Sequence, residues 1–147
     1  MQSNFPVTGV SHSDAMAYTK WLSEKTGKTY RLPNAKEAKK WNEKAVKSAK
    51  KENTLNYLAG YDLTLDDAKK LQLELDSLKM NSIKEVGSFE ALKMNKSDIY
   101  DLGGNVREMT LDSTKVFGFA ALDFADLSNP IYFGGNSFTG FRVVLVK

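Results

Sequence analysis

The chain has 147 residues, 41% hydrophobic and 27% charged, which is typical of one globular domain rather than a disordered segment. It contains no cysteine, which excludes disulfides, thiolate metal sites and cysteine nucleophiles. The net charge of +3 comes with acidic residues spread throughout, so nucleic acid is not an expected partner. No apolar run approaches the roughly 18 residues of a transmembrane span, and the first residues lack the pattern of a signal peptide.

The N-terminal part of the sequence predicts a strand followed by a helix. Phe5–Val10 form the predicted strand. Ser11 is a candidate N-cap, with Asp14 three residues later as in a capping box, and Gly27 ends the helix. Helical spacing predicts that its buried face carries Ala15, Tyr18, Trp21 and Leu22.

A second helix is predicted after the short extended segment Thr29–Leu32. Pro33 stops that segment, and Asn34 then caps a helix with Glu37 at its third position. The helix is expected to run to about Lys51. Lysines recur along it and could meet anionic groups, but a solvated face explains them better, since glutamates interrupt the stripe of Lys36, Lys40, Lys44, Lys47 and Lys51.

The rest of the chain predicts one more helix and then strands. Thr64 caps a helix whose apolar stripe is Leu65, Ala68, Leu71, Leu75 and Leu78. The segments expected to be extended are Ile83–Phe89, Tyr132–Gly135 and Phe141–Val146. Helices early and strands late predict an α+β fold with helices on an antiparallel sheet. Aromatic residues cluster late in the chain, where core packing explains them better than a ligand groove, at Phe117, Phe119, Phe124, Tyr132, Phe133 and Phe138.

The most informative stretch runs from Asp101 to Met109. Its two adjacent glycines, Gly103 and Gly104, allow a tight left-handed turn that folds the chain back on itself. Asp101 and Glu108 could then converge with backbone carbonyls between them. Such an oxygen-only set is the kind of site that Ca²⁺ prefers.

The same stretch resembles the "GNVWEW" signature of the formylglycine-generating enzyme/sulfatase-modifying factor family. Three more segments resemble that family in the same order along the chain. Pro6–Ala15 is similar to "PVxxVSWxDA", Tyr30–Pro33 to "YRLPTEAEW" and Gly140–Val144 to "GFRVV". The resemblance implies a C-type-lectin-like fold, with a small antiparallel sheet, packed helices and long loops. It covers residues 1–147 as one domain, truncated at its N-terminal side relative to the family.

The resemblance also implies calcium as a candidate cofactor. In calcium-binding family members the ligands would correspond here to the side chains of Asp101 and Glu108 and the carbonyls of Gly104 and Val106. The alternative is that both carboxylates brace the loop by accepting backbone N–H bonds. Arg107 and Met109 stand where the family usually has tryptophan, which favours the second interpretation.

Family catalysis needs two copper-binding cysteines between "GGS" and "GFR". Only Ser137, Phe138 and Thr139 lie there in this chain, and none is a cysteine. The single histidine, His12, cannot form the histidine-rich iron site of related sulfoxide synthases. We therefore expect no catalytic residues and interpret the chain as a non-catalytic binding or structural module.

The resemblance further implies a bacterial cell-envelope or secreted protein, attached to other domains or to an envelope complex. One alternative is a formylglycine-generating or related oxidase whose catalytic residues lie outside this chain. A second alternative is a variable ligand-binding protein of C-type-lectin-like fold, although the variable stretch of such proteins is the one shortened here.

Overall fold

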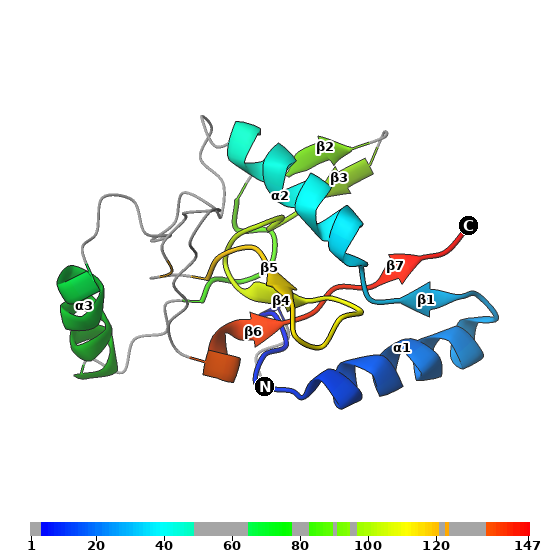
Figure 1. Cartoon of the computed structure of the whole chain (residues 1–147), viewed down its shortest axis with the longest axis horizontal. Coiled ribbons are helices and arrows are strands. Elements are labelled where there is room, and N and C mark those ends of the chain that lie inside the picture. Colours follow the sequence, from blue (N-terminus) through cyan, green and yellow to red (C-terminus); the bar gives the residue numbers. More distant parts are fainter. Residues whose placement is uncertain are drawn as a thin grey trace.

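The computed structural model describes residues 4–48, 65–77, 83–89, 91–94, 97–120, 123 and 135–147. Within these ranges the chain is a mixture of helices and short strands, as the α+β prediction requires (Figure 1). The helices are α1 (His12–Thr26), α2 (Ala35–Ser48) and α3 (Leu65–Ser77). A short 3₁₀ turn, η2, covers Gly135–Phe138. In Figure 1, α1 and α2 lie on either side of the central strands, while α3 lies apart from them.

The central sheet has the strand order β5-β4-β6 and positions the 101–109 stretch. Its middle strand β4 (Arg107–Met109) is buried along its whole length. It pairs antiparallel with β5 (Val116–Phe117) and parallel with β6 (Thr139–Gly140). The sheet is therefore mixed, and the prediction of an antiparallel sheet is wrong for the β4–β6 pair.

Two smaller antiparallel sheets flank the central one in the described residues. β1 (Tyr30–Arg31) pairs with β7 (Val144–Leu145), which joins the first third of the chain to its C-terminal end. β2 (Leu92–Met94) and β3 (Ser97–Ile99) form a hairpin. Strands of two or three residues are marginal alone, so the packing of α1 and α2 must hold them.

The predicted N-caps of the first two helices are confirmed. The Ser11 hydroxyl accepts a bond from the backbone N–H of Asp14, whose carboxylate accepts one from the Ser11 N–H, each at 3.1 Å. Asn34 and Glu37 exchange the same pair of bonds at 2.8 and 2.9 Å. Gly27 ends α1 in the left-handed conformation, with a φ of 67°. These signals are local, which is why the sequence reveals them.

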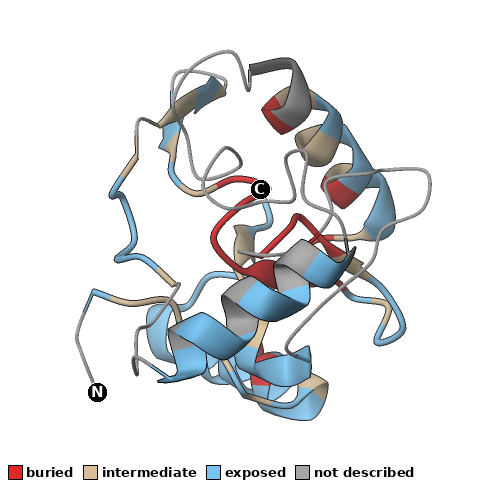
Figure 2. Ribbon diagram, turned by 90° about the vertical axis from the view of Figure 1, so that its left-hand side faces the viewer, coloured by how far each residue is buried: buried red, intermediate tan, exposed pale blue. Residues whose placement is uncertain are grey.

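The buried residues gather around β4 and the turn before it (Figure 2). One apolar cluster joins α1, the segment after β1, and β4, through Ala15, Leu32 and Met109. A second cluster joins α2, the turn and β5, through Ala38, Leu102 and Phe117. The two clusters fix β4 between the first two helices.

Several predicted elements differ from the structure. Phe5–Val10 is not a strand: it makes a single antiparallel bridge, between Thr8 and Gly140, because Pro6 has no N–H to donate and Gly9 has a φ of 73°. A side chain at Gly140 would overlap the Val7 carbonyl, so this glycine allows the close approach.

The other corrections concern the length and burial of elements. Phe141–Val146 narrows to β7, and Ile83–Phe89 contains a turn instead of a strand. On α1, Ala15 and Thr19 are buried, whereas Tyr18 and Trp21 are exposed. The strands β2 to β5 were not predicted, since two or three residues carry no readable periodicity.

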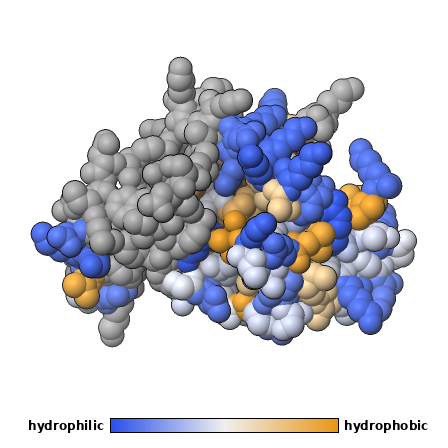
Figure 3. Space-filling model, in the orientation of Figure 1, coloured by the Kyte–Doolittle hydropathy of each residue, from blue (hydrophilic) through white to orange (hydrophobic). Residues whose placement is uncertain are grey.

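Some predictions fall outside the described residues, namely the α2 end near Lys51, the cap at Thr64, position Leu78, Tyr132–Gly134 and Phe124. The side chains of the predicted α3 stripe, Leu65, Ala68, Leu71 and Leu75, also lie outside them. The face drawn in Figure 3 shows hydrophobic side chains in separate patches between hydrophilic ones. No helix in the described ranges has the length and apolar character to cross a membrane.

Candidate functional site

The 101–106 turn is tight and left-handed, as predicted, but its positive φ angles fall on unexpected residues. Asp101 has a φ of 53° and Asn105 one of 68°, while Gly103 has 82°. The Gly104 N–H donates to the Asp101 carbonyl at 3.4 Å, and the Val106 N–H donates to the Gly104 carbonyl at 2.9 Å. Asp and Asn tolerate this conformation better than other side chains. A side chain at Gly103 would meet the Ala45 methyl group at 2.9 Å, so α2 packs directly on the turn.

The turn holds the segment that precedes β2. The Asn105 amide is almost fully buried and makes two bonds of 2.9 Å with the backbone N–H and carbonyl of Lys84. The Asp101 carboxylate accepts a bond of 2.8 Å from the Gly87 N–H. The sequence does not reveal this role of Asn105, because its contact with Lys84 joins residues 21 positions apart. The side chains of Asn105 and Asp101 therefore both fasten the turn to the segment around Lys84 and Gly87.

Glu108 forms an ion pair with Arg142. The guanidinium donates through Nε to Oε2 at 2.5 Å and through Nη2 to Oε1 at 2.6 Å, a bidentate arrangement. Nη2 also approaches the carbonyls of Asp101 and Tyr100, at 3.3 and 3.4 Å. Burial raises the pKa of the Glu108 carboxyl, and the charge of Arg142 opposes that rise. The negative charge of Asp101 raises the pKa of both the Glu108 carboxyl and the Arg142 guanidinium.

Of the predicted calcium ligands, Glu108 contacts the Arg142 guanidinium through its side chain, and Asp101 contacts it only through its backbone carbonyl. Glu108 is engaged by Arg142, and the Gly104 carbonyl accepts from Val106. Asp101 accepts from Gly87 through its side chain and from Arg142 through its carbonyl. In this arrangement the donor set does not fit calcium, because a guanidinium takes the oxygen atoms that a metal would need. Asp101 accepts a backbone N–H bond, as the bracing alternative requires, whereas Glu108 pairs with a side chain instead. Calcium binding stays a prediction.

Arg107 points to the opposite side of β4 from Glu108, as neighbouring residues of a strand do. It donates to both carboxylate oxygens of Asp123, at 2.7 and 3.0 Å, and both side chains are almost completely buried. Further bonds run from Arg107 to the Gly135 carbonyl at 2.6 Å and to the Thr139 hydroxyl at 3.3 Å. Arg107 was noted only as a departure from the family pattern, and no local signal connects it with Asp123.

His12 has a structural position. Its Nε2 lies 2.8 Å from the carbonyl oxygen of Thr110, so the ring ties the first turn of α1 to the end of β4. Ser137 and Phe138 belong to η2, and Thr139 opens β6 and bonds to Arg107. In the part of the chain that the structure describes, no three acidic or histidine side chains converge on a possible metal position.

A groove of about 740 Å³ opens beside the turn. Its walls come from residues 6–10, from the Asp14 and Tyr18 side of α1, from residues 98–108 and from residues 141–143, with Val86 at its edge. Most of the lining is apolar, and Arg142 and Glu108 are part of it. We call this feature the acidic groove, because its lining carries the carboxylates of Asp14, Asp98, Asp101 and Glu108.

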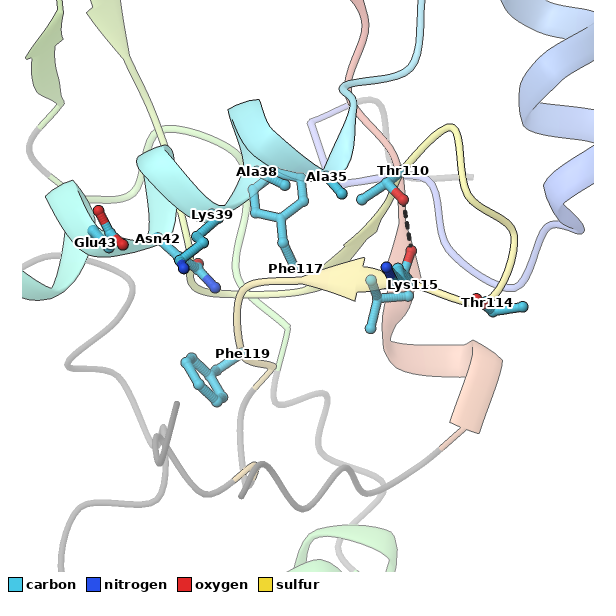
Figure 4. Close-up of a pocket in the computed structure, with 11 residues that line it drawn as sticks. Ala35, Ala38, Lys39, Asn42, Glu43, Thr110, Thr114, Lys115, Phe117 and Phe119 are labelled. Carbon is cyan, nitrogen blue, oxygen red and sulfur yellow. Dashed lines mark hydrogen bonds between the residues drawn. The ribbon is translucent and has the colours of Figure 1, made fainter. Parts of the chain in front are cut away.

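A second cavity, of about 550 Å³, lies between α2 and β5 (Figure 4). Phe117 points toward α2 from its floor, and Lys39, Asn42 and Glu43 descend from the helix. The Thr110 hydroxyl donates to the Lys115 carbonyl at 3.0 Å at its far end. Phe117 and Phe119 are buried here, which agrees with core packing of the late aromatic residues that are described.

The lysine stripe on α2 is partly confirmed as a surface feature. Lys36 and Lys40 are exposed. Lys44 is instead partly buried and donates to the Lys93 carbonyl at 2.8 Å, so it fastens the β2–β3 hairpin to the helix. The side chains of Lys47 and Lys51 lie outside the described residues.

Comparison with known proteins gives one match. The family model described as the sulfatase-modifying factor enzyme 1-like domain matches residues 1–145. No curated protein and no solved structure matches the chain. The match covers all four motifs on which the resemblance depends, including the turn and the Arg142 segment.

Proposed function

Because the chain belongs to the sulfatase-modifying factor enzyme 1-like domain family, we propose that it is a non-catalytic member that works as a binding or structural module. The observation that carries this proposal is the complete absence of cysteine from its 147 residues. A thiolate is both the soft ligand that Cu(I) prefers and the redox partner that the family's oxidation needs. No other side chain supplies both.

The positions of the remaining candidate groups support the proposal. His12 is bonded to the Thr110 carbonyl, and Glu108 is bonded to Arg142. A general base must be within reach of a substrate proton, and neither group is free of a structural partner. The acidic groove is the feature that supports a binding role. Its volume falls in the usual range of ligand-binding clefts, roughly 300–1,000 Å³.

The finer parts of the proposal rest on the family resemblance. We propose a C-type-lectin-like arrangement of the domain, a location in the bacterial cell envelope or outside the cell, and attachment to other domains or to an envelope complex. Calcium at Asp101, Gly104, Val106 and Glu108, which the resemblance implies, would require Arg142 to leave the Glu108 carboxylate. The variable-protein alternative is disfavoured, because only residues 137–139 lie between the two motifs concerned.

The test of the non-catalytic role is a turnover assay. The purified chain is supplied with copper and a sulfatase-derived peptide that contains the target cysteine, and mass spectrometry follows conversion to formylglycine. We expect no product above a control with copper alone. Reproducible turnover above that control would refute the proposal. It would support the oxidase alternative, in which the missing catalytic groups come from another chain or segment.

A further inference from the structure

We propose that the acidic groove binds a basic, apolar peptide segment of another protein. This inference deepens the binding role proposed above and depends on it. Three features of the groove carry the argument: apolar side chains left exposed at its edges, an excess of carboxylates in its lining, and aromatic rings beside them.

The apolar side chains are the first feature. Val7, Tyr18, Val86 and Tyr100 line the groove and are 50%, 42%, 54% and 46% exposed, although all are large and hydrophobic. Trp21, at 53%, continues this surface along α1, with its ring centroid 5.5 Å from that of Tyr18. Large apolar side chains that gather at one cleft indicate an interaction site, whereas scattered ones do not. A partner that contacts this groove must therefore offer apolar side chains.

The charges are the second feature. Among the described residues, the lining contains four carboxylates, Asp14, Asp98, Asp101 and Glu108, and one cation, Arg142. Glu108 takes that guanidinium in a bidentate pair. Hydrogen bonds from Ser11 lower the pKa of the Asp14 carboxyl, which favours its charged form. The chain as a whole has a net charge of +3, so the groove reverses the overall sign and selects a cationic partner.

The aromatic rings are the third feature. Tyr18 packs edge-on against Phe141, with ring centroids 5.5 Å apart, and both line the groove. Lysine and arginine can lay their methylene stems along such apolar surface while the charged head reaches a carboxylate or a ring face. A peptide in which lysine alternates with leucine offers both kinds of contact. This combination favours a peptide over a small inorganic cation, which would leave the exposed apolar side chains uncovered.

The experiment uses isothermal titration of the whole chain with three capped pentapeptides. The first alternates leucine and lysine, the second has glutamine for lysine, and the third has glycine for leucine. We expect the first to bind, and the other two to bind at least about fivefold more weakly, because each lacks one kind of contact. Binding of the first should also weaken as salt screens the exposed charges.

Variants locate the site. Asp98 is exposed on β3, so Asp98→Asn should keep the fold and weaken the leucine–lysine peptide about two- to fivefold, the range of an exposed ion pair. Val86→Ser should also weaken binding. Asp66→Asn, the same charge change at an exposed residue of α3, should leave binding unchanged.

Each other outcome would overturn the inference. Equal binding of the glutamine peptide would remove the role of charge, and equal effects of Asp98→Asn and Asp66→Asn would move the site elsewhere. Self-association of the chain that Val86→Ser abolishes would assign the groove to a second copy. Absence of any binding heat would also reject the peptide, but it would leave the turnover result unaffected, so the two failures are distinguishable.

Discussion

Arg107 and Glu108 are adjacent on β4, yet Arg107 pairs in the interior and Glu108 pairs at the wall of the acidic groove. The Arg107 and Asp123 side chains are 3% and 0% exposed, and they also bond to backbone and hydroxyl groups. The Glu108 and Arg142 side chains are 9% and 21% exposed and form part of the acidic groove. The same chemistry therefore has two uses: one pair joins β4 to residues 123, 135 and 139, and the other lies where a partner can reach it.

The two ion pairs on β4 therefore have different roles. A fully buried ion pair is isolated from solvent, so its role is to hold the elements that contact it. A pair at the wall of an open groove can be solvated and can meet a ligand. Substitutions on the two sides of β4 should reveal this difference.

Removing a partner of the inner pair should be the most damaging change. Asp123→Ala leaves the Arg107 guanidinium buried without its carboxylate, which typically costs about 3–5 kcal/mol. Urea unfolding should show this loss in the free energy of unfolding. Glu24→Ala, which breaks the exposed Lys20–Glu24 pair, is the matched control and should cost less than about 1 kcal/mol. Similar losses in both variants would contradict a structural role for the inner pair.

Removing the cation of the outer pair should cost less. Arg142→Gln leaves Glu108 without its guanidinium, but water in the groove can solvate the carboxylate, so we expect roughly 2–3 kcal/mol. The same urea measurement gives the value. Arg142→Lys keeps the charge but loses the bidentate geometry, and should fall between wild type and Arg142→Gln. A loss as large as that of Asp123→Ala would mean that water in the groove does not stabilise the unpaired Glu108 carboxylate.

The pH dependence distinguishes Glu108 from a surface carboxylate. The pKa of Glu37 is lowered, chiefly by hydrogen bonds from Arg31, so its contribution to stability is present above the ordinary carboxyl value and is lost as the pH falls. Burial instead raises the pKa of Glu108, and loss of Arg142 raises it further. The cost of Arg142→Gln should therefore fade at a higher pH than the cost of Arg31→Gln. Unfolding curves of both variants between neutral pH and about pH 3 check this order, and the reverse order would contradict it.

Calcium should have the smallest effect. Since Arg142 already bonds to Glu108 and to the Asp101 carbonyl, the thermal midpoint of the wild type should be the same in calcium and in chelator. Arg142→Gln releases those oxygen atoms, so calcium should raise the midpoint of that variant if the turn keeps its shape. A wild-type midpoint several degrees higher in calcium would establish the metal site that the family resemblance implies.

The sequence predicts the local features of this chain well. The caps at Ser11 and Asn34 depend on residues three positions away, and the left-handed turn depends on its own short motif. That Asp101 and Glu108 lie close enough to interact electrostatically was also predictable from that turn. These signals need no knowledge of the tertiary structure.

The partners of the same residues could not be predicted. Glu108 meets Arg142 across 34 positions, and Arg107 meets Asp123 across 16. Which carboxylate an arginine reaches depends on the parallel pairing of β4 with β6, and strands of two residues give no pattern that reveals it. The exposure of Tyr18 was missed for a similar reason, since helical spacing marks an apolar face without showing that a groove leaves part of it open.

The central claim is that the Glu108 side of β4 forms the binding face of a non-catalytic domain. An amide NMR titration with the leucine–lysine pentapeptide tests it most directly. The account predicts shifts at Val7, Val86 and Tyr100 around the acidic groove, and none at Asn42 and Thr114 in the cavity between α2 and β5. Shifts confined to that second cavity, or no shifts at any peptide concentration, would contradict it.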